Sequence, residues 1–169
     1  MGMAFPATFL NPAKTIELIG IAMPQPMVQK SEREEIIEAV TGLFVATDDR
    51  DWDAVRSCFT DTVLFNTGLT NWEPVMIARE RIAEAWENGL ADLQAIHHQV
   101  GNFLVTPDAD GVSVFCYGIA YHYLPERSNR NTKIFVGSYT LHLVKDEAWK
   151  IDKFTFNEKF VAGNTHLGE

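Results

Sequence analysis

The sequence predicts a single α+β domain in which helices lie against one face of an antiparallel sheet. The chain has 169 residues and is 46% hydrophobic, which suits one domain with its own core. Apolar residues recur at helical spacing in the first half, whereas β-branched and aromatic runs fill the second half from His97 onward. Helices followed by strands are typical of the α+β class.

Residues 1–30 contain four of the seven prolines and show no sustained apolar period. They predict an irregular N-terminal arm that docks on its own domain or on a second subunit. We place the domain at 31–160 and a C-terminal tail at 161–169.

Three helices are predicted in the domain. Ser31 and Glu34 form a capping box, which predicts a helix start followed by an apolar stripe that ends near Asp48. Asp51 can cap a short second helix, and residues 62–65 follow as a strand. Residues 75–93 are predicted as a third helix whose inner face is apolar and includes Trp86.

The second half predicts four strands in a meander. Turn residues separate the strand-type runs. The four runs span 97–105, 112–124, 133–145 and 148–157.

Composition excludes several classes of function. The formal net charge of −9 disfavours binding to a phosphate backbone, so no nucleic-acid partner is expected. No apolar stretch approaches the roughly 20 residues of a membrane span. Cys58 and Cys116 stand in no zinc or disulfide pattern, which is typical of a cytoplasmic protein. We expect no metal, no membrane contact and no nucleotide cofactor, because the corresponding motifs are missing.

The histidines of the strands are the candidates for chemistry. Alternation places His122 on a face of small residues and His98 on a face with Asn102, so both could project into a cavity. The same alternation puts Tyr117, Tyr121 and Tyr139 on the face opposite the histidines.

Two further histidines and one carboxylate need separate interpretations. His97 and His142 are interpreted as structural residues. Asp48, at the end of the first helical stripe, could orient an imidazole.

The order of elements resembles the nuclear transport factor 2-like cone, and within it the SnoaL-like group, over about 31–160. The stretch Asp48-Asp49-Arg50-Asp51-Trp52-Asp53 is similar to one in scytalone dehydratases, as are His98 after the third helix and His122 near the end of the next strand. The resemblance implies a cone-shaped roll with the helices over the concave face of a curved sheet.

The resemblance also implies roles for residues. His98 would be the acid–base catalyst, with Asp48 and His122 as its supporting pair, and neither metal nor organic cofactor would take part. The pocket tyrosines and asparagine of that family fall at threonines here, so scytalone itself is a poor candidate substrate. The substrate-binding residues that we expect are Thr47, Thr67, Thr140, Trp86 and Asn102.

These observations lead to one main hypothesis and two alternatives. The main hypothesis is a cofactor-independent lyase, such as a dehydratase, or an isomerase that acts on a small apolar hydroxylated or carbonyl compound. The alternatives are a non-catalytic protein that binds a small ligand, and a structural subunit like the β subunit of ring-hydroxylating dioxygenases. The resemblance also implies a homodimer.

Overall fold

The computed structural model describes residues 30–67, 73–125 and 130–167 of the chain. The predicted N-terminal arm therefore lies, apart from Lys30, outside the described residues. Three helices are present: α1 (Glu32–Asp48), α2 (Trp52–Ser57) and α3 (Arg79–Leu90). Six strands accompany them: β1 (Phe59–Asn66), β2 (Val75–Ala78), β3 (Ala95–Pro107), β4 (Val112–Tyr123), β5 (Thr132–Lys145) and β6 (Trp149–Gly163).

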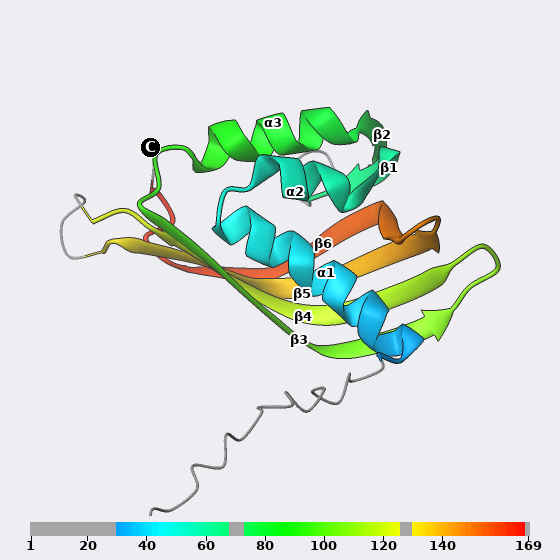
Figure 1. Ribbon diagram of the computed structural model, residues 1–169. Helices are drawn as coiled ribbons and strands as arrows, with labels where there is room; N and C mark the ends of the chain where they lie inside the picture. Colours follow the sequence, from blue (N-terminus) through cyan, green and yellow to red (C-terminus); the bar gives the residue numbers. More distant parts are fainter. Residues whose placement is uncertain (1–29, 68–72, 126–129, 168–169) are drawn as a thin grey trace, which may run out of the picture.

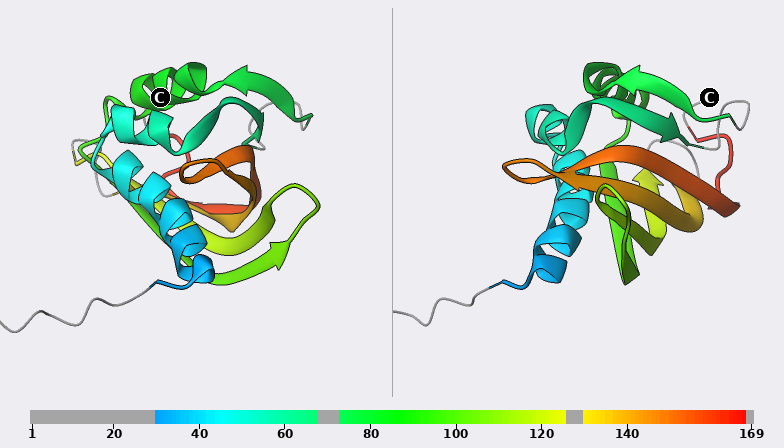
Figure 2. Two further views of the ribbon diagram at one scale, coloured as in Figure 1. Left: turned by 45° about the vertical axis from the view of Figure 1, so that its right-hand side comes forward. Right: turned by 90° about the vertical axis from the view of Figure 1, so that its right-hand side faces the viewer.

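The strands form one mixed sheet in the order β2-β1-β6-β5-β4-β3. The pairs from β3 to β6 are antiparallel, which confirms the predicted meander, whereas β1 pairs with β6 in parallel. Figures 1 and 2 show a strongly curved sheet with the three helices on one side and α1 running obliquely past β3. The α+β prediction is thereby confirmed.

The two helix caps predicted from the sequence are both present. The Ser31 hydroxyl accepts a hydrogen bond from the Glu34 amide at 3.3 Å, and the Glu34 carboxylate accepts one from the Ser31 amide at 2.7 Å. At α2, the Asp51 carboxylate accepts from the Ala54 amide at 3.0 Å. These bonds satisfy amides that have no partner within a helix.

The prediction of a helix over 75–93 was wrong at both ends. Val75–Ala78 is strand β2, which pairs antiparallel with β1 and so satisfies its backbone through the sheet. α3 then begins at Arg79 without any side-chain cap and ends at Leu90. The apolar run at 75–78 suits either state, and pairing with β1 decides it.

The main core lies between the helices and the concave face of the sheet. Its fully buried side chains include Val40 and Leu43 of α1, Phe59 of β1 and Leu141 of β5. Side chains from both halves of the chain therefore share one core, as a single domain requires. Within the described residues, no helix is both long and apolar enough to cross a membrane.

His142, interpreted from the sequence as a structural residue, is buried next to two carboxylates. It is 3% exposed, and its Nδ1 lies 2.6 Å from a carboxylate oxygen of Asp152 on β6. On its other side, Nε2 lies 3.3 Å from Oδ1 of Asp110, in the turn between β3 and β4. The imidazole thus pairs with β6 through Asp152 and lies beside this turn, where Nε2 has no hydrogen-bond partner among the described residues, on the face of β5 that is opposite to Leu141.

Candidate functional site

Asp48 and His98 meet where the end of α1 approaches the start of β3. One carboxylate oxygen of Asp48 accepts a hydrogen bond from the backbone amide of His98 at 2.8 Å. The other lies 2.6 Å from Nδ1 of the same histidine. Both side chains are largely buried, at 18% and 12% exposure. The carboxylate therefore fixes both the backbone and the ring of His98.

This contact assigns the tautomer of His98. An ionised carboxylate can only accept hydrogen bonds, so Nδ1 must carry the proton that lies between the ring and Asp48. In the neutral ring, Nε2 is then left with a free lone pair that can accept a proton. The pair has the arrangement of a general base oriented by a carboxylate.

Arg50 holds α3 beside the end of α1. Its backbone is left-handed, with φ of 56°, which turns the chain sharply after the helix. Its guanidinium donates hydrogen bonds to the carbonyl oxygens of Leu90 at 3.2 Å and Leu93 at 2.5 Å. These carbonyls at and beyond the end of α3 gain a donor, and α3 is positioned next to the Asp48–His98 pair.

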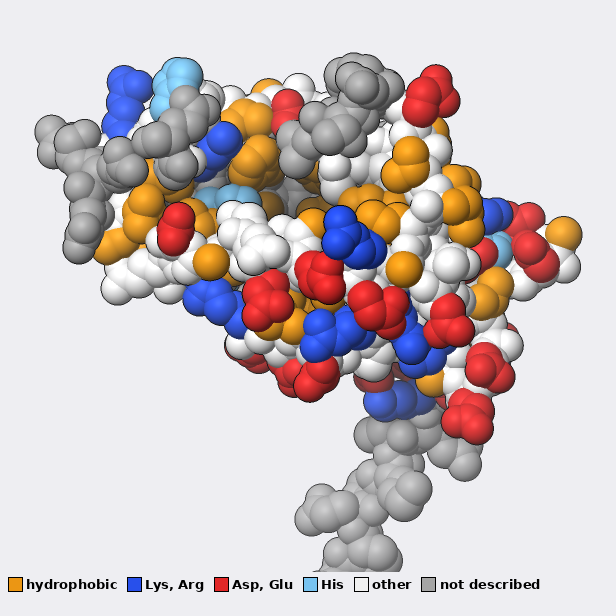
Figure 3. Space-filling model, turned by 90° about the horizontal axis from the view of Figure 1, so that it is seen from above, with side chains coloured by type: hydrophobic (Ala, Val, Ile, Leu, Met, Phe, Trp, Pro, Cys, Tyr) orange, Lys and Arg blue, Asp and Glu red, His pale blue; other side chains and the backbone are white. Residues whose placement is uncertain are grey.

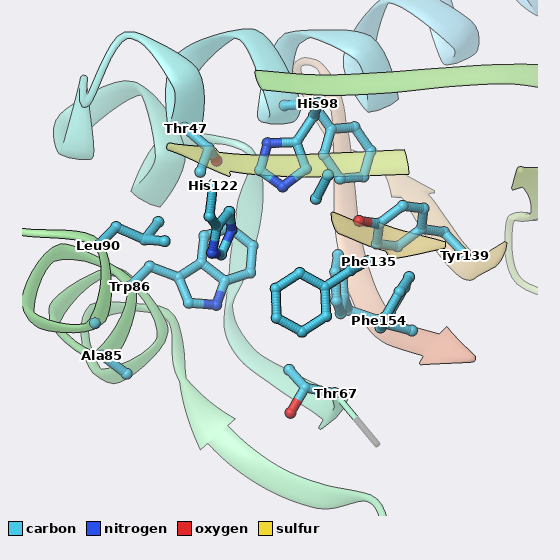
Figure 4. A pocket seen from close by; sticks show the side chains of 14 residues that line it. Thr47, Thr67, Ala85, Trp86, Leu90, His98, His122, Phe135, Tyr139 and Phe154 are labelled. Atoms are coloured by element: carbon cyan, nitrogen blue, oxygen red, sulfur yellow. The ribbon is translucent and has the colours of Figure 1, made fainter. Parts of the chain in front are cut away.

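A cavity of about 300 Å³ lies beside this pair, between α1, α3 and the sheet. Figure 3 shows a hollow with a histidine side chain inside it and hydrophobic side chains around it. Figure 4 shows aromatic rings and the His98 and His122 imidazoles turned toward the same space. The lining residues are Phe44, Thr47, Thr67, Ala85, Trp86, Gly89, Leu90, His98, Ala120, His122, Phe135, Tyr139, Phe154 and Phe156.

His122 enters the cavity from β4 and packs on the ring of Phe135, with 5.0 Å between the ring centroids. Burial lowers the pKa of His122 from its ordinary value near 6.5 to about 4. The neighbouring His98 and Lys133 lower it further, and Asp48 opposes them. His122 is therefore a neutral imidazole at pH 7, able to donate one hydrogen bond and accept another.

The comparisons with known proteins identify the family of the domain. The family model of the SnoaL-like domain matches residues 29–155. The chain belongs to the SnoaL-like domain family. The resemblance inferred from the sequence is confirmed.

Solved structures share the fold of this SnoaL-like domain. The Kfla4162 protein of Kribbella flavida is 23% identical with a TM-score of 0.74, over 80% of this chain and 95% of that one. A protein of Novosphingobium aromaticivorans named as a candidate scytalone dehydratase is 16% identical, with a TM-score of 0.66 over 78% and 86% of the two chains. A hexachlorocyclohexane dehydrochlorinase of Novosphingobium barchaimii, LinA-type3, is 16% identical, with a TM-score of 0.64 over 79% and 90%. No curated protein matches the sequence.

The SnoaL-like domain brings most of the sequence-predicted residues to the cavity. His98, His122, Thr47, Thr67 and Trp86 line it, and Asp48 lies behind His98. The Thr47 hydroxyl already donates to the Leu43 carbonyl at 2.8 Å, so its proton is engaged within α1.

Thr140 and Asn102, both predicted to bind substrate, do not line the cavity. Thr140 is exposed, and its hydroxyl accepts a hydrogen bond from Asn157 at 3.3 Å. Asn102 has a left-handed φ of 58° at a bulge where the β3–β4 register shifts, which breaks the alternation that linked it to His98.

Tyr139 lines the cavity, which corrects the prediction that it lies opposite the histidines. In the observed register Cys116 pairs with Tyr139 and Ala120 with Phe135, so even residues of β4 share a face with odd residues of β5. His122 and Tyr139 therefore project to the same side. The signal that could have found Tyr139 is the β4–β5 register, which counting within one strand does not provide.

The described part of the cavity lining contains no fixed charge. None of the described lining residues is Lys, Arg, Asp or Glu. In the part of the chain that the structure describes, no group of three His, Cys, Asp or Glu side chains has an arrangement that could hold a metal ion. The site as described offers imidazole, hydroxyl and aromatic groups to a ligand.

The low pKa of His122 predicts a pH-dependent stability. Below about pH 6.5 an unfolded histidine binds a proton, whereas the folded His122 resists protonation until about pH 4. In this window the unfolded state binds more protons, so the free energy of unfolding falls as the pH falls. His122→Asn is expected to flatten this dependence, as measured by urea unfolding at about pH 7 and pH 5.

The control for this prediction is His97→Asn, because the side chain of His97 is 69% exposed. It should keep the wild-type slope of stability against pH. Equal slopes for His122→Asn and the wild type would contradict the assignment.

Proposed function

We propose that this SnoaL-like domain is a cofactor-independent lyase or isomerase, and specifically a dehydratase of small apolar carbonyl compounds. The observation that carries the proposal is the contact of His98 Nδ1 with Asp48 at 2.6 Å beside an apolar cavity. That contact leaves Nε2 as a base beside a cavity whose lining is largely aromatic.

The proposed reaction begins with removal of a proton from the carbon next to a carbonyl. Nε2 of His98 accepts this proton, and Asp48 stabilises the imidazolium that forms. The electrons of the C–H bond form the enolate, which then expels a hydroxyl group from the β-carbon. Transfer of the same proton to the departing oxygen gives water and an unsaturated carbonyl product. Return of the proton to another carbon would give an isomer instead.

Two probes test this chemistry without knowledge of the natural substrate. The aldol adduct of benzaldehyde and acetone loses water to give benzalacetone, whose conjugation is followed by absorbance. Benzylacetone has no leaving group, so exchange of its α-protons in deuterium oxide, measured by NMR, reports proton removal alone. We expect the protein to accelerate both reactions above their rates in buffer. If dehydration of the aldol adduct and α-proton exchange of benzylacetone both proceed at the buffer rate, the proposal is contradicted.

The apolar lining also favours the alternative of a ligand-binding protein without catalysis. In that case benzylacetone would bind equally well after replacement of Asp48 and His98, and no α-proton would exchange. Binding and exchange are measured on the same samples, so the two functions are separated directly.

A homodimer in the cytoplasm completes the proposal. Leu104, Tyr117 and Phe160 are exposed by 65%, 45% and 54%, which supports association of a second copy through the strands that carry them. Free Cys58 and Cys116 fit a reducing compartment. Sedimentation velocity should give twice the mass of the chain, and a monomer at micromolar concentration would contradict the dimer.

A further inference from the structure

Tyr139 lies on the concave face of the sheet, where it pairs in register with Cys116 of β4 and Phe156 of β6. The residue is only 5% exposed, and Figure 4 shows its hydroxyl directed into the cavity on the side of the histidines. A side chain at Gly118 would not fit beside the ring, because an added Cβ would lie 2.2 Å from a ring carbon of Tyr139. The glycine leaves the space that the ring occupies.

Three aromatic neighbours fix the direction of the Tyr139 ring. Its centroid lies 4.6 Å from that of Phe44, 4.9 Å from Phe156 and 5.6 Å from Phe154. Tilted ring pairs at such distances are favourable and restrict rotation. The hydroxyl is therefore presented to the cavity at a defined position before any ligand binds.

The Tyr139 hydroxyl makes no hydrogen bond to any other described residue, although buried tyrosines usually have a partner. Burial, with smaller contributions from Cys116 and Asp48, raises the pKa of Tyr139. The phenol thus keeps its proton at neutral pH and can donate it in a hydrogen bond. A ligand oxygen in the cavity would be the acceptor.

The charge of the cavity restricts which oxygen this can be. Its described lining offers no lysine or arginine to balance a carboxylate or phosphate, and His122 is neutral at pH 7. A neutral acceptor avoids the cost of burying an unpaired anion. A carbonyl oxygen is a neutral acceptor, and the carbonyl group also acidifies the C–H bond next to it, as the proposed reaction requires.

We propose that Tyr139 donates a hydrogen bond to the ketone or aldehyde oxygen of the substrate, and so selects neutral carbonyl compounds whose α-carbon faces His98. This inference rests on the proposed function for the part that His98 plays and for the choice of a carbonyl, whereas hydrogen bonding of Tyr139 to a neutral oxygen rests on the cavity alone. The hydrogen bond also stabilises the enolate oxygen as negative charge develops on it.

The test compares benzylacetone with butylbenzene, which has the same carbon skeleton without the oxygen. Trp86 lines the cavity, so tryptophan fluorescence reports binding of either compound. Tyr139→Phe should weaken binding of benzylacetone by about 3- to 10-fold, as expected for loss of one neutral hydrogen bond, and leave binding of butylbenzene unchanged. Tyr123→Phe, at an exposed position of β4 that does not line the cavity, should change neither affinity.

The outcomes separate this inference from the proposed function. If Tyr139→Phe leaves the affinity for benzylacetone unchanged, or weakens both compounds equally, Tyr139 does not recognise the carbonyl. If wild-type protein fails to exchange α-protons while benzylacetone binding still depends on Tyr139, the lyase proposal fails and carbonyl recognition stands. A lower kcat for exchange in Tyr139→Phe would show in addition that the hydrogen bond from Tyr139 to the carbonyl oxygen is stronger in the transition state than in the bound substrate.

Discussion

Replacing His98 by glutamine is expected to lower the rate of α-proton exchange by about 100- to 10,000-fold, the usual contribution of general acid–base catalysis. Glutamine can still donate a hydrogen bond to Asp48, so the fold around the site is retained. It has no group that can accept a proton from carbon. The same loss should appear in dehydration of the aldol adduct, measured by absorbance.

His97→Gln is the matched control for this variant. His97 precedes His98 in β3 but is 69% exposed and stacks on Tyr121, with 6.2 Å between the ring centroids. Its Nδ1 lies 3.7 Å from Asp48, so it shares the neighbourhood without lining the cavity. Rates within a factor of about two for wild type and His98→Gln would refute the role of His98, because general bases contribute far more.

Replacing Asp48 by asparagine is expected to lower both activity and stability. The Asp48 carboxylate accepts from two donors of His98, at 2.8 and 2.6 Å, whereas an asparagine amide offers one oxygen. The amide then either leaves the Nδ1 donor unpaired in a largely buried position, which costs about 1–3 kcal/mol, or donates from its nitrogen to Nδ1 of the other ring tautomer. The histidine also loses the partner that holds its tautomer, so kcat should fall by at least about 100-fold.

Asp49→Asn is the control for Asp48→Asn, since the next residue is exposed and caps the end of α1. Urea unfolding gives the change in stability, and α-proton exchange gives the change in kcat. A carboxylate at the C-terminal end of a helix is disfavoured by the helix dipole. A variant Asp48→Asn that is as stable and active as the wild type would show that His98 does not need this carboxylate.

Local signals predicted the first helix and the meander well. Ser31 and Glu34 start α1 through their side chains, and the strand-type runs after His97 are long and bounded by turn residues. The parallel pairing of β1 with β6 joins two strands that are far apart in the sequence. Nothing in either strand alone indicates it, because the partner is set by how the whole sheet assembles.

The family resemblance and the helix periodicity were enough to predict Asp48 and His98 as parts of the candidate site. Asp48 ends an apolar stripe, and its contact with His98 follows from the packing of α1 against β3. Tyr139 was predicted on the wrong face because its face depends on the register between two strands. Asn102 was wrongly predicted to line the cavity because a bulge changes the alternation. Both errors concern pairing geometry, which a single strand does not encode.

The cavity has a consequence for finding its ligand. Its walls come from α1, α3, β3, β4, β5, β6 and the residue after β1, so no partly unfolded form that loses one of these elements keeps the complete pocket. A compound that binds there stabilises only the folded domain, by about 2.7 kcal/mol at a concentration of 100 Kd. Thermal melting in a library of neutral carbonyl compounds thus reports on the pocket through the melting of the whole domain, and it needs no assay of turnover.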